Sequence, residues 1–206
     1  MVGQEVVRQL SADPSVGRIL AYARKRPSHQ LPKVEHWPFS LQEFDIPQGV
    51  HMVLCALGTT MRKAGSREAF IRVDHDSVLA IGGRANSVGI ERFGIVSSLG
   101  ADAKSINFYL RIKGQADEGL KAIGFKRLAI LKPSLLLGNR TEKRMGENIG
   151  RWVYRCTKFL FVGPLAKYRG IEAVDVAKTL ISIVRDGEGT ITIDSESIKI
   201  IANGIR

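Results

Sequence analysis

Two side chains that could share proton chemistry, Tyr109 and Lys113, stand four residues apart in the sequence. On a helix, residues i and i+4 lie on one face, so the phenol and the ammonium would project together. A neighbouring cation favours the phenolate and lowers the pKa of a tyrosine from its usual value of about 10. A hydroxyl from the serine pair that precedes them, Ser97 and Ser98, would hold a substrate carbonyl oxygen. The set is typical of acid–base catalysis near neutral pH.

The same spacing occurs a second time, because Lys158 follows Tyr154 by four residues. Either pair could also be an accidental neighbour pair on a solvated helix face. Context separates them: only Tyr109 follows an apolar run, residues 93–96, that ends in serines. A polar stretch, residues 141–144, stands upstream of Tyr154 instead. Tyr109 is therefore the candidate proton donor.

The elements that would position these residues alternate between strands and helices, which is typical of a doubly wound parallel sheet in an α/β protein. Strands are expected over residues 16–23, near 34, and over 50–56, 93–98, 128–131 and 189–193. Helices are expected over residues 2–12, 74–88, 107–123 and 175–184, with a basic amphipathic helix within 140–158. Neither repeats nor linker composition interrupt the chain, which predicts one domain over residues 1–206.

Length and composition narrow the class of protein. A chain of 206 residues can bury a sizeable core. Its two cysteines, Cys55 and Cys156, form neither a metal pattern nor a disulfide framework, and we expect reduced thiols and no metal site. Apolar runs stay shorter than the roughly 18 residues of a membrane span, and residues 1–8 lack signal-peptide architecture. These features predict a soluble protein of the cytoplasm.

Positive charge is concentrated in one part of the chain. The formal net charge is +11, and residues 101–170 hold 15 Lys/Arg against 5 Asp/Glu. Part of this excess forms one face of the expected helix within 140–158, through Arg144, Arg151, Arg155 and Lys158. The simplest reading is a solvated basic face over an apolar packing face. Nucleic-acid signatures are missing, which argues against a nucleic-acid partner. A phosphorylated cofactor or an acidic substrate would also suit the charge.

Several segments, in the right order, resemble the short-chain dehydrogenase/reductase superfamily, and more closely its atypical Tat-interactive-protein-like oxidoreductases. The matching blocks are residues 56–60, 63–66, Arg72-Val73-Asp74, 96–104, 108–109 with 113–114, 132–138 and 168–177. The resemblance runs from Gly3 to about residue 195. It implies a Rossmann-like fold and NAD(P)-dependent oxidation or reduction of an unknown carbonyl or alcohol.

The resemblance also implies catalytic roles at the matching positions. Tyr109 would exchange a proton with the substrate oxygen. Lys113 would hydrogen-bond the nicotinamide ribose and lower the pKa of Tyr109. Ser98, or failing that Ser97, would orient the substrate oxygen.

Cofactor contacts follow from the resemblance in the same way. The segment Leu57, Gly58, Thr59 would pass along the adenosine and phosphates, and Pro133, Ser134, Leu135 would line the nicotinamide pocket. Arg24 stands where a basic residue can pair with a 2′-phosphate, whereas an acidic residue there would favour NAD. The expected cofactor is therefore NADP rather than NAD, although Arg24 could also be an ordinary loop arginine.

The start of the chain departs from the family pattern. Members begin with a strand and a G-x-x-G-x-x-G loop that meets the pyrophosphate, and Gly3 matches only its last glycine. Either the sequence starts at an internal methionine of a longer reading frame, or the protein lacks the first strand and binds a dinucleotide poorly. A family Asp near the adenine is also replaced, since the segment reads Trp37-Pro38-Phe39-Ser40.

Three functional hypotheses result from these residues. The first is an NADP(H)-dependent oxidoreductase that transfers protons through Tyr109, Lys113 and a serine, with a small and possibly anionic substrate. The second is a non-catalytic regulatory or interaction protein that senses NADP(H). The third is a truncated form with impaired dinucleotide binding. The sequence does not predict an oligomeric state.

Overall fold

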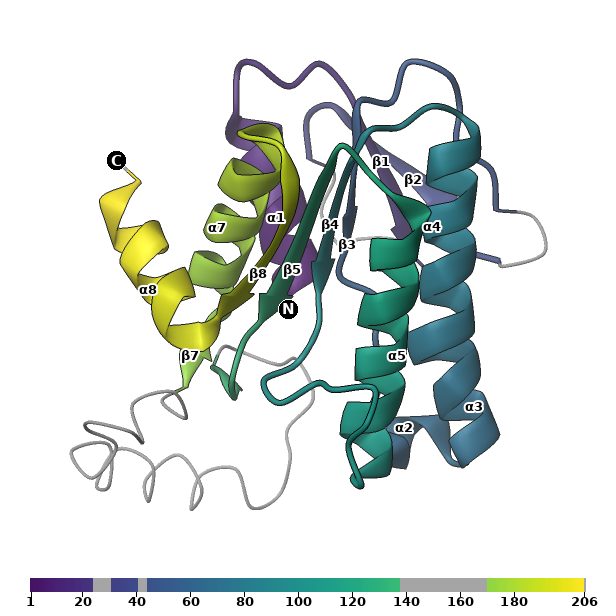
Figure 1. Ribbon diagram of the computed structural model, residues 1–206. Coiled ribbons are helices and arrows are strands. Elements are labelled where there is room, and N and C mark those ends of the chain that lie inside the picture. The colour runs from purple at the N-terminus through teal and green to yellow at the C-terminus, as the bar shows by residue number, and fades with distance from the viewer. Residues whose placement is uncertain (24–30, 41–43, 138–169, 206) are drawn as a thin grey trace.

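The computed structural model describes residues 1–23, 31–40, 44–137 and 170–205. Parallel strands form a central layer between two layers of helices (Figure 1). Helices α1 (Val2–Ala12), α7 (Ala173–Arg185) and α8 (Ser195–Gly204) lie on one side of this layer. Helices α4 (Ser77–Ser87) and α5 (Phe108–Ile123) lie on the other. The predicted α/β class with a Rossmann-like arrangement is confirmed.

Among the described residues, all strand pairs are parallel, and they form three separate sheets. The largest sheet has the order β3-β4-β5-β8, with bounds Met52–Cys55, Arg92–Val96, Arg127–Lys132 and Gly189–Asp194. Two smaller sheets pair β1 (Ile19–Ala23) with β2 (Val34–Pro38), and β6 (Leu136–Leu137) with β7 (Ile171–Glu172).

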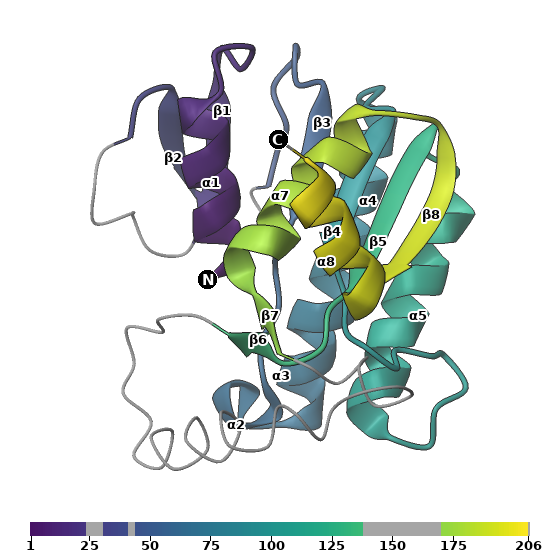
Figure 2. The ribbon, with the colours of Figure 1, turned by 90° about the vertical axis from the view of Figure 1, so that its left-hand side faces the viewer.

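The strand layer is interrupted at one point, as expected from the missing first strand of the family pattern. Strands β1 and β3 do not pair with each other, and no described residue supplies a strand between them. Figure 2 shows β1 and β2 at one end of the strand layer and β8 at the other. Packing, rather than a shared ladder, joins the β1–β2 pair to the rest: α1 contacts both β1 and α7. On the other face, the Arg84 guanidinium of α4 pairs with Asp45, in the segment after β2.

Two apolar clusters hold the layers together, one on each face of the large sheet. The first joins α1, α7 and α8 to the strands through residues such as Val6, Leu180 and Ile198. The second lies under α4 and α5 and includes Phe93 and Leu120, both fully buried. Strand β5 is buried on both faces, as expected of a central parallel strand.

Helix α5, which carries the Tyr/Lys pair, has clear local signals at both ends. The Asn107 side chain caps its start by accepting a hydrogen bond from the Leu110 N–H at 3.2 Å. Gly124 ends it in the left-handed conformation at φ 82°. Its buried stripe, which includes Ile112, Ala116 and Leu120, packs against the sheet and α4. The predicted helix is confirmed to within one residue.

The helix predicted over 74–88 is the later part of a longer run of three helical pieces in the structure. Helix α3 (Arg67–Ile71) continues into a π-helical turn, η1 (Arg72–Asp76), and then into α4. A short helix, α2 (Met61–Ala64), precedes them. Helix α4 continues through its glycine pair. A Cβ at Gly82 would stand 2.6 Å from Leu120 Cδ2 of α5, so a larger residue would not fit there. The glycine lets α4 and α5 approach closely.

The basic helix predicted within residues 140–158 lies outside the described residues. Within the described ranges, none of the helices combines the length and the apolar character that crossing a membrane requires.

Candidate functional site

The predicted catalytic and cofactor segments gather at the carboxyl edge of the large sheet. Residues 57–59 follow β3, the serine pair follows β4 and residues 133–135 follow β5. The ladder between β4 and β5 continues past the strands, because Leu99 N–H donates to the Pro133 carbonyl at 3.0 Å. Helix α5 begins at the same edge (Figure 1). Ligands of open α/β sheets bind at this edge.

Tyr109 is the second residue of α5 and is half-buried. Its ring packs against Phe70 of α3, with ring centroids 5.3 Å apart. The neighbouring Phe108 ring lies near two cations, with the Arg67 guanidinium carbon 5.1 Å and that of Arg111 5.7 Å from its centroid. Two positive charges therefore flank the residue next to the candidate proton donor.

Lys113, one turn further along α5, is almost completely buried and forms an ion pair. Its Nζ lies 2.9 Å from Asp74 Oδ1, with the two side chains 6% and 0% exposed. Burial pushes the pKa of Lys113 down, but the Asp74 carboxylate outweighs it, and the pKa is raised above its usual value. Tyr109 lies near enough to contribute to this shift. The lysine is thus a fixed positive charge beside the tyrosine.

Asp74 also reaches the segment predicted to contact the cofactor. Its Oδ2 accepts a hydrogen bond from the Thr59 backbone N–H at 2.8 Å. Gly58 is exposed, and a Cβ there would stand 3.2 Å from Asp74 Oδ1 and 3.5 Å from Lys113 Nζ. Residues 57–59 therefore lie directly against the Asp74–Lys113 pair. The structure brings this predicted cofactor segment and the predicted catalytic lysine together.

The two serines differ in what surrounds them. Ser97 is buried and donates to Asp117 Oδ2 at 3.0 Å, and the Lys132 ammonium lies 3.1 Å from the same oxygen. Burial raises the pKa of Asp117, although the Ser97 hydrogen bond and the Lys132 charge oppose the shift. Ser98 is half-buried, and its hydroxyl has only a long contact of 3.5 Å with the Leu99 carbonyl. Ser98 is the serine better placed to meet a substrate.

The segment predicted to line the nicotinamide pocket is anchored to the sheet. Pro133 is buried, while Leu135 is 63% exposed. Ser134 is held between them, because its backbone N–H donates to Ser195 Oγ at 3.2 Å and the two hydroxyl oxygens lie 2.8 Å apart. An anchored segment with an exposed apolar side chain suits one wall of a ligand site.

The start of α1 bears on whether a dinucleotide fits. A Cβ at Gly3 would lie 3.4 Å from the Ala56 Cβ, so the first turn of α1 stands beside the carboxyl end of β3. Met1 provides no side-chain cap for this turn. Backbone N–H groups at a helix N-terminus attract phosphate, so this placement fits a pyrophosphate. Arg24 lies outside the described residues.

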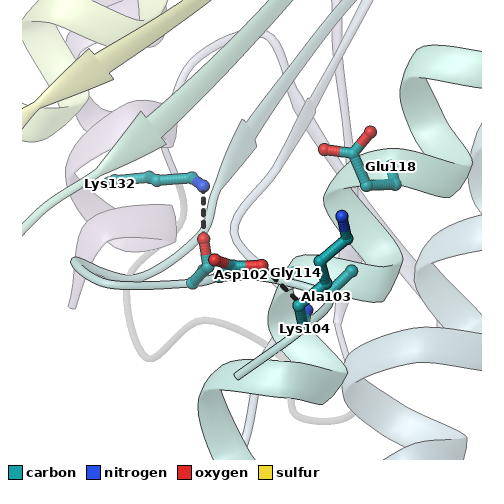
Figure 3. A pocket seen from close by; sticks show the side chains of 7 residues that line it. Asp102, Ala103, Lys104, Gly114, Glu118 and Lys132 are labelled. Atoms are coloured by element: carbon teal, nitrogen blue, oxygen red, sulfur yellow. Dashed lines mark hydrogen bonds between the residues drawn. The ribbon is translucent and has the colours of Figure 1, made fainter.

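A cavity of about 310 Å³ lies on another side of α5, near the Asp117–Lys132 pair (Figure 3). Residues 101–104, Gly114, Glu118 and Lys132 line it. Two of its polar side chains already have partners: the Lys132 ammonium donates to the Ala101 carbonyl at 2.7 Å, and Asp102 Oδ1 accepts from the Lys104 N–H at 2.8 Å. None of the predicted site residues lines this cavity, and we assign it no ligand.

Metal chemistry was not predicted, and the described residues contain no group of three or more metal-ligating side chains. Cys55 is a free, buried thiol whose pKa is raised by burial. Cys156 lies outside the described ranges.

A helix-flanked parallel sheet with Tyr109, Lys113 and Ser98 at its carboxyl edge defines a protein of the short-chain dehydrogenase/reductase class. Solved structures support this fold. MoeE5 in complex with UDP-glucose and NAD superposes with a TM-score of 0.65 at 14% identity, covering 99% of this chain and 78% of that one. The oxidoreductase ylbE of Lactococcus lactis gives a TM-score of 0.64 at 18% identity, covering 99% and 91%.

Sequence comparison identifies the family more closely. The chain is 35% identical to mitochondrial protein fmp52 of Emericella nidulans over 180 residues, which are 81% of this chain and 72% of that protein. It is 41% identical to protein HTATIP2 of Rattus norvegicus over 104 residues, which are 50% of this chain and 43% of that protein. Models of protein families give no match. The chain belongs to the Fmp52 and HTATIP2 family of atypical, NAD(P)-binding short-chain dehydrogenase/reductase-like oxidoreductases.

The prediction of a cytoplasmic location is wrong by the same comparisons. Relatives from several fungi, including Emericella nidulans and Candida albicans, are named as mitochondrial proteins. The prediction depended on the lack of secretory and membrane-spanning signals. Such a lack does not distinguish the cytoplasm from the mitochondrion, which explains the error.

Sequence reasoning missed two acids of the site. In the sequence analysis, Asp74 is only part of a block that matches the family, and Asp117 is not considered as a site residue. Both are buried, at 0% and 1% exposure. An acidic residue inside an otherwise apolar helical stripe is a usable signal, because buried carboxylates require partners. The partners themselves come from other elements and could not be predicted from spacing.

Proposed function

We propose that this protein is an NADP(H)-dependent oxidoreductase of the short-chain type that acts on a carbonyl or alcohol. One observation carries the proposal: Lys113 is held charged beside Tyr109 and against the segment 57–59, at the edge of the sheet where Ser98 is half-buried. Proton-transfer and cofactor-binding groups therefore meet at one place.

In the direction of carbonyl reduction, Tyr109 Oη donates its proton to the substrate oxygen as negative charge develops there. The Ser98 hydroxyl donates a hydrogen bond to the same oxygen and orients it. The buried Lys113 ammonium stabilises the phenolate that remains. A bound nicotinamide would supply or accept the hydride. Alcohol oxidation runs through the same groups in reverse.

Residues at the sheet edge fit a dinucleotide. The first turn of α1 would meet the pyrophosphate, residues 57–59 the adenosine half, and Pro133-Ser134-Leu135 the nicotinamide. Among similar folds, MoeE5 was solved with NAD and RMD of Pseudomonas aeruginosa with NADPH. For this chain we favour NADP, because Arg24 follows β1, where a basic side chain can pair with a 2′-phosphate.

An anionic small molecule is the substrate class that the surroundings of Tyr109 favour. The guanidinium groups of Arg67 and Arg111 flank Phe108. Such groups bind carboxylate and phosphate well. Neither a nucleic acid nor a membrane partner is part of the proposal.

The two Tyr/Lys pairs of the chain provide a matched test of the mechanism. Tyr109→Phe removes the proton donor and is expected to lower turnover by about 10²–10⁴-fold while NADPH binding is retained, which is the usual range for a general acid. Tyr154→Phe removes the hydroxyl of the other pair and is expected to keep turnover. NADPH oxidation with a panel of carbonyl compounds measures both. Full activity of Tyr109→Phe would refute the assignment.

A protein with impaired dinucleotide binding is the second candidate. The observation that favours it is the break between β1 and β3, which leaves the sheet discontinuous beside the proposed pyrophosphate site. A fluorescence titration with NADPH separates the two candidates. Saturable binding without turnover of any carbonyl would instead favour a protein that senses NADP(H).

A further inference from the structure

Asp74 occupies an unusual position between the two halves of the proposed site. It lies in the π-helical turn η1, and such turns are frequent at functional sites. Its carboxylate is fully buried. One oxygen faces Lys113 Nζ of α5 at 2.9 Å, and the other accepts the Thr59 N–H at 2.8 Å. A single side chain thus joins the proposed catalytic helix to the proposed cofactor segment.

Both carboxylate oxygens of Asp74 face donors, and this restricts which residue can stand there. An asparagine has the same shape but offers one acceptor oxygen and one NH₂ group. Its NH₂ would face either the Lys113 ammonium or the Thr59 N–H, so one donor would lose its partner. The geometry therefore requires a carboxylate, not merely a polar side chain of this size.

Three ionisable groups raise the pKa of Lys113. Asp74 in η1 supplies the opposing charge, Tyr109 lies one turn before it on α5, and the Cys55 thiol follows from β3. Asp117, one turn after Lys113, is itself influenced by the lysine but is already engaged by Ser97 and Lys132. Asp74 is thus the counter-charge that allows an ammonium to stay ionised at 6% exposure.

We propose that Asp74 is a positioning residue of this enzyme: its carboxylate keeps the buried Lys113 protonated and fixes the segment Leu57-Gly58-Thr59 against it. The inference rests on the proposed function, since it concerns how that site is kept ready for a dinucleotide and for proton transfer. It predicts that the charge of Lys113, and with it the affinity for NADPH, depends on a residue that touches neither the cofactor nor the substrate.

The sign of the expected pH effect follows from the burial of Lys113. With Asp74 present, the pKa of Lys113 is raised and the ammonium stays charged across the neutral and mildly alkaline range. Without that charge, burial is the largest remaining influence, and it lowers a lysine pKa. In Asp74→Asn, Lys113 should therefore lose its proton as pH rises, and NADPH affinity should fall over the same range.

Titration of the free protein by NMR, with ¹³C-labelled lysine, tests the inference without any cofactor. The Lys113 resonance is identified by its absence in Lys113→Arg. Between about pH 6 and pH 9, where lysines in water stay protonated, we expect no Lys113 titration in the natural protein and a titration step in Asp74→Asn. Asp74→Glu, which restores the charge, should remove that step again.

NADPH fluorescence titrations at the two ends of this pH range complete the experiment. We expect the affinity of Asp74→Asn to fall at least about tenfold from low to high pH, relative to the natural protein. A constant loss of affinity at every pH, without a Lys113 step, would mean a merely structural role and would overturn the proposal. If Asp74→Asn does not fold, the natural protein still decides: a Lys113 that deprotonates within this range contradicts the inference. Loss of turnover in Tyr109→Phe is independent of this outcome, so the two proposals fail separately.

Discussion

Gly114, the residue after Lys113, offers a quantitative test of how the site is packed. A Cβ at this position would stand 2.1 Å from the Asp102 carbonyl carbon and 2.2 Å from the Ala103 nitrogen. These are backbone atoms, so no side-chain rotation can relieve the contact. Gly114→Ala must push residues 101–104 away from α5, and these residues follow the serine pair after Leu99 and Gly100.

The expected magnitude combines two opposing terms. Alanine in a helix interior is favoured over glycine by about 1 kcal/mol. Overpacking costs about 1–3 kcal/mol, and a backbone contact belongs at the upper end of that range. The net loss of unfolding free energy is therefore about 2 kcal/mol. With a denaturant slope of about 2 kcal/mol per M urea, the unfolding midpoint should fall by about 1 M.

Gly83 of α4 is a matched control, because it is exposed and a Cβ there would meet nothing within 4 Å. In Gly83→Ala only the higher helix propensity of alanine acts, without overpacking, and the free energy of unfolding should rise by about 0.5–1 kcal/mol. Urea unfolding of both variants, followed by far-UV circular dichroism, measures the difference. The packing account is refuted if Gly114→Ala unfolds at the same urea concentration as the natural protein, or later.

Two further predictions concern a buried acid and the choice of cofactor. Burial raises the pKa of Asp117 above its ordinary 3.8, so the native state binds this proton more tightly than the unfolded chain does. The unfolding free energy of the natural protein relative to Asp117→Asn should therefore fall as pH rises from about 4 towards neutrality; urea titrations at both pH values measure it, and a constant difference would contradict the shift. Arg24→Glu should weaken NADPH binding at least about tenfold and leave NADH binding nearly unchanged. Equal losses for both dinucleotides would count against a 2′-phosphate contact.

The sequence predicts the elements with strong local signals and misses those without them. Helix α5 has a cap, an apolar stripe and a terminal glycine, and its limits were predicted closely. Residues 61–76 form one short helix, a second helix and a π-turn, none of which has enough length to show a periodic stripe. The interruption between β1 and β3, in contrast, agrees with the missing first strand that the start of the sequence indicated.

The candidate site shows the same division. The Tyr109/Lys113 spacing and the serine pair are local features. The apolar strand before the serines was enough to distinguish this Tyr/Lys pair from the second one in the chain. The partner of Lys113, in contrast, comes from another helix, and its identity depends on how η1 faces α5. The need for glycine at positions 82 and 114 also depends on the three-dimensional structure, since each glycine allows another segment to approach a helix. Sequence patterns locate the reacting groups, whereas packing sets their charge and position.

Isotope transfer tests the central claim most directly. The protein is incubated with NADPH that carries deuterium at the hydride-donating carbon and with a panel of small anionic carbonyl compounds, and the products are examined by mass spectrometry. We predict an alcohol that has gained one deuterium from a single face of the cofactor, with formation about 10²–10⁴-fold slower in Tyr109→Phe. An alcohol formed equally fast in Tyr109→Phe would contradict the account, and so would the absence of deuterium transfer to any compound while NADPH is bound.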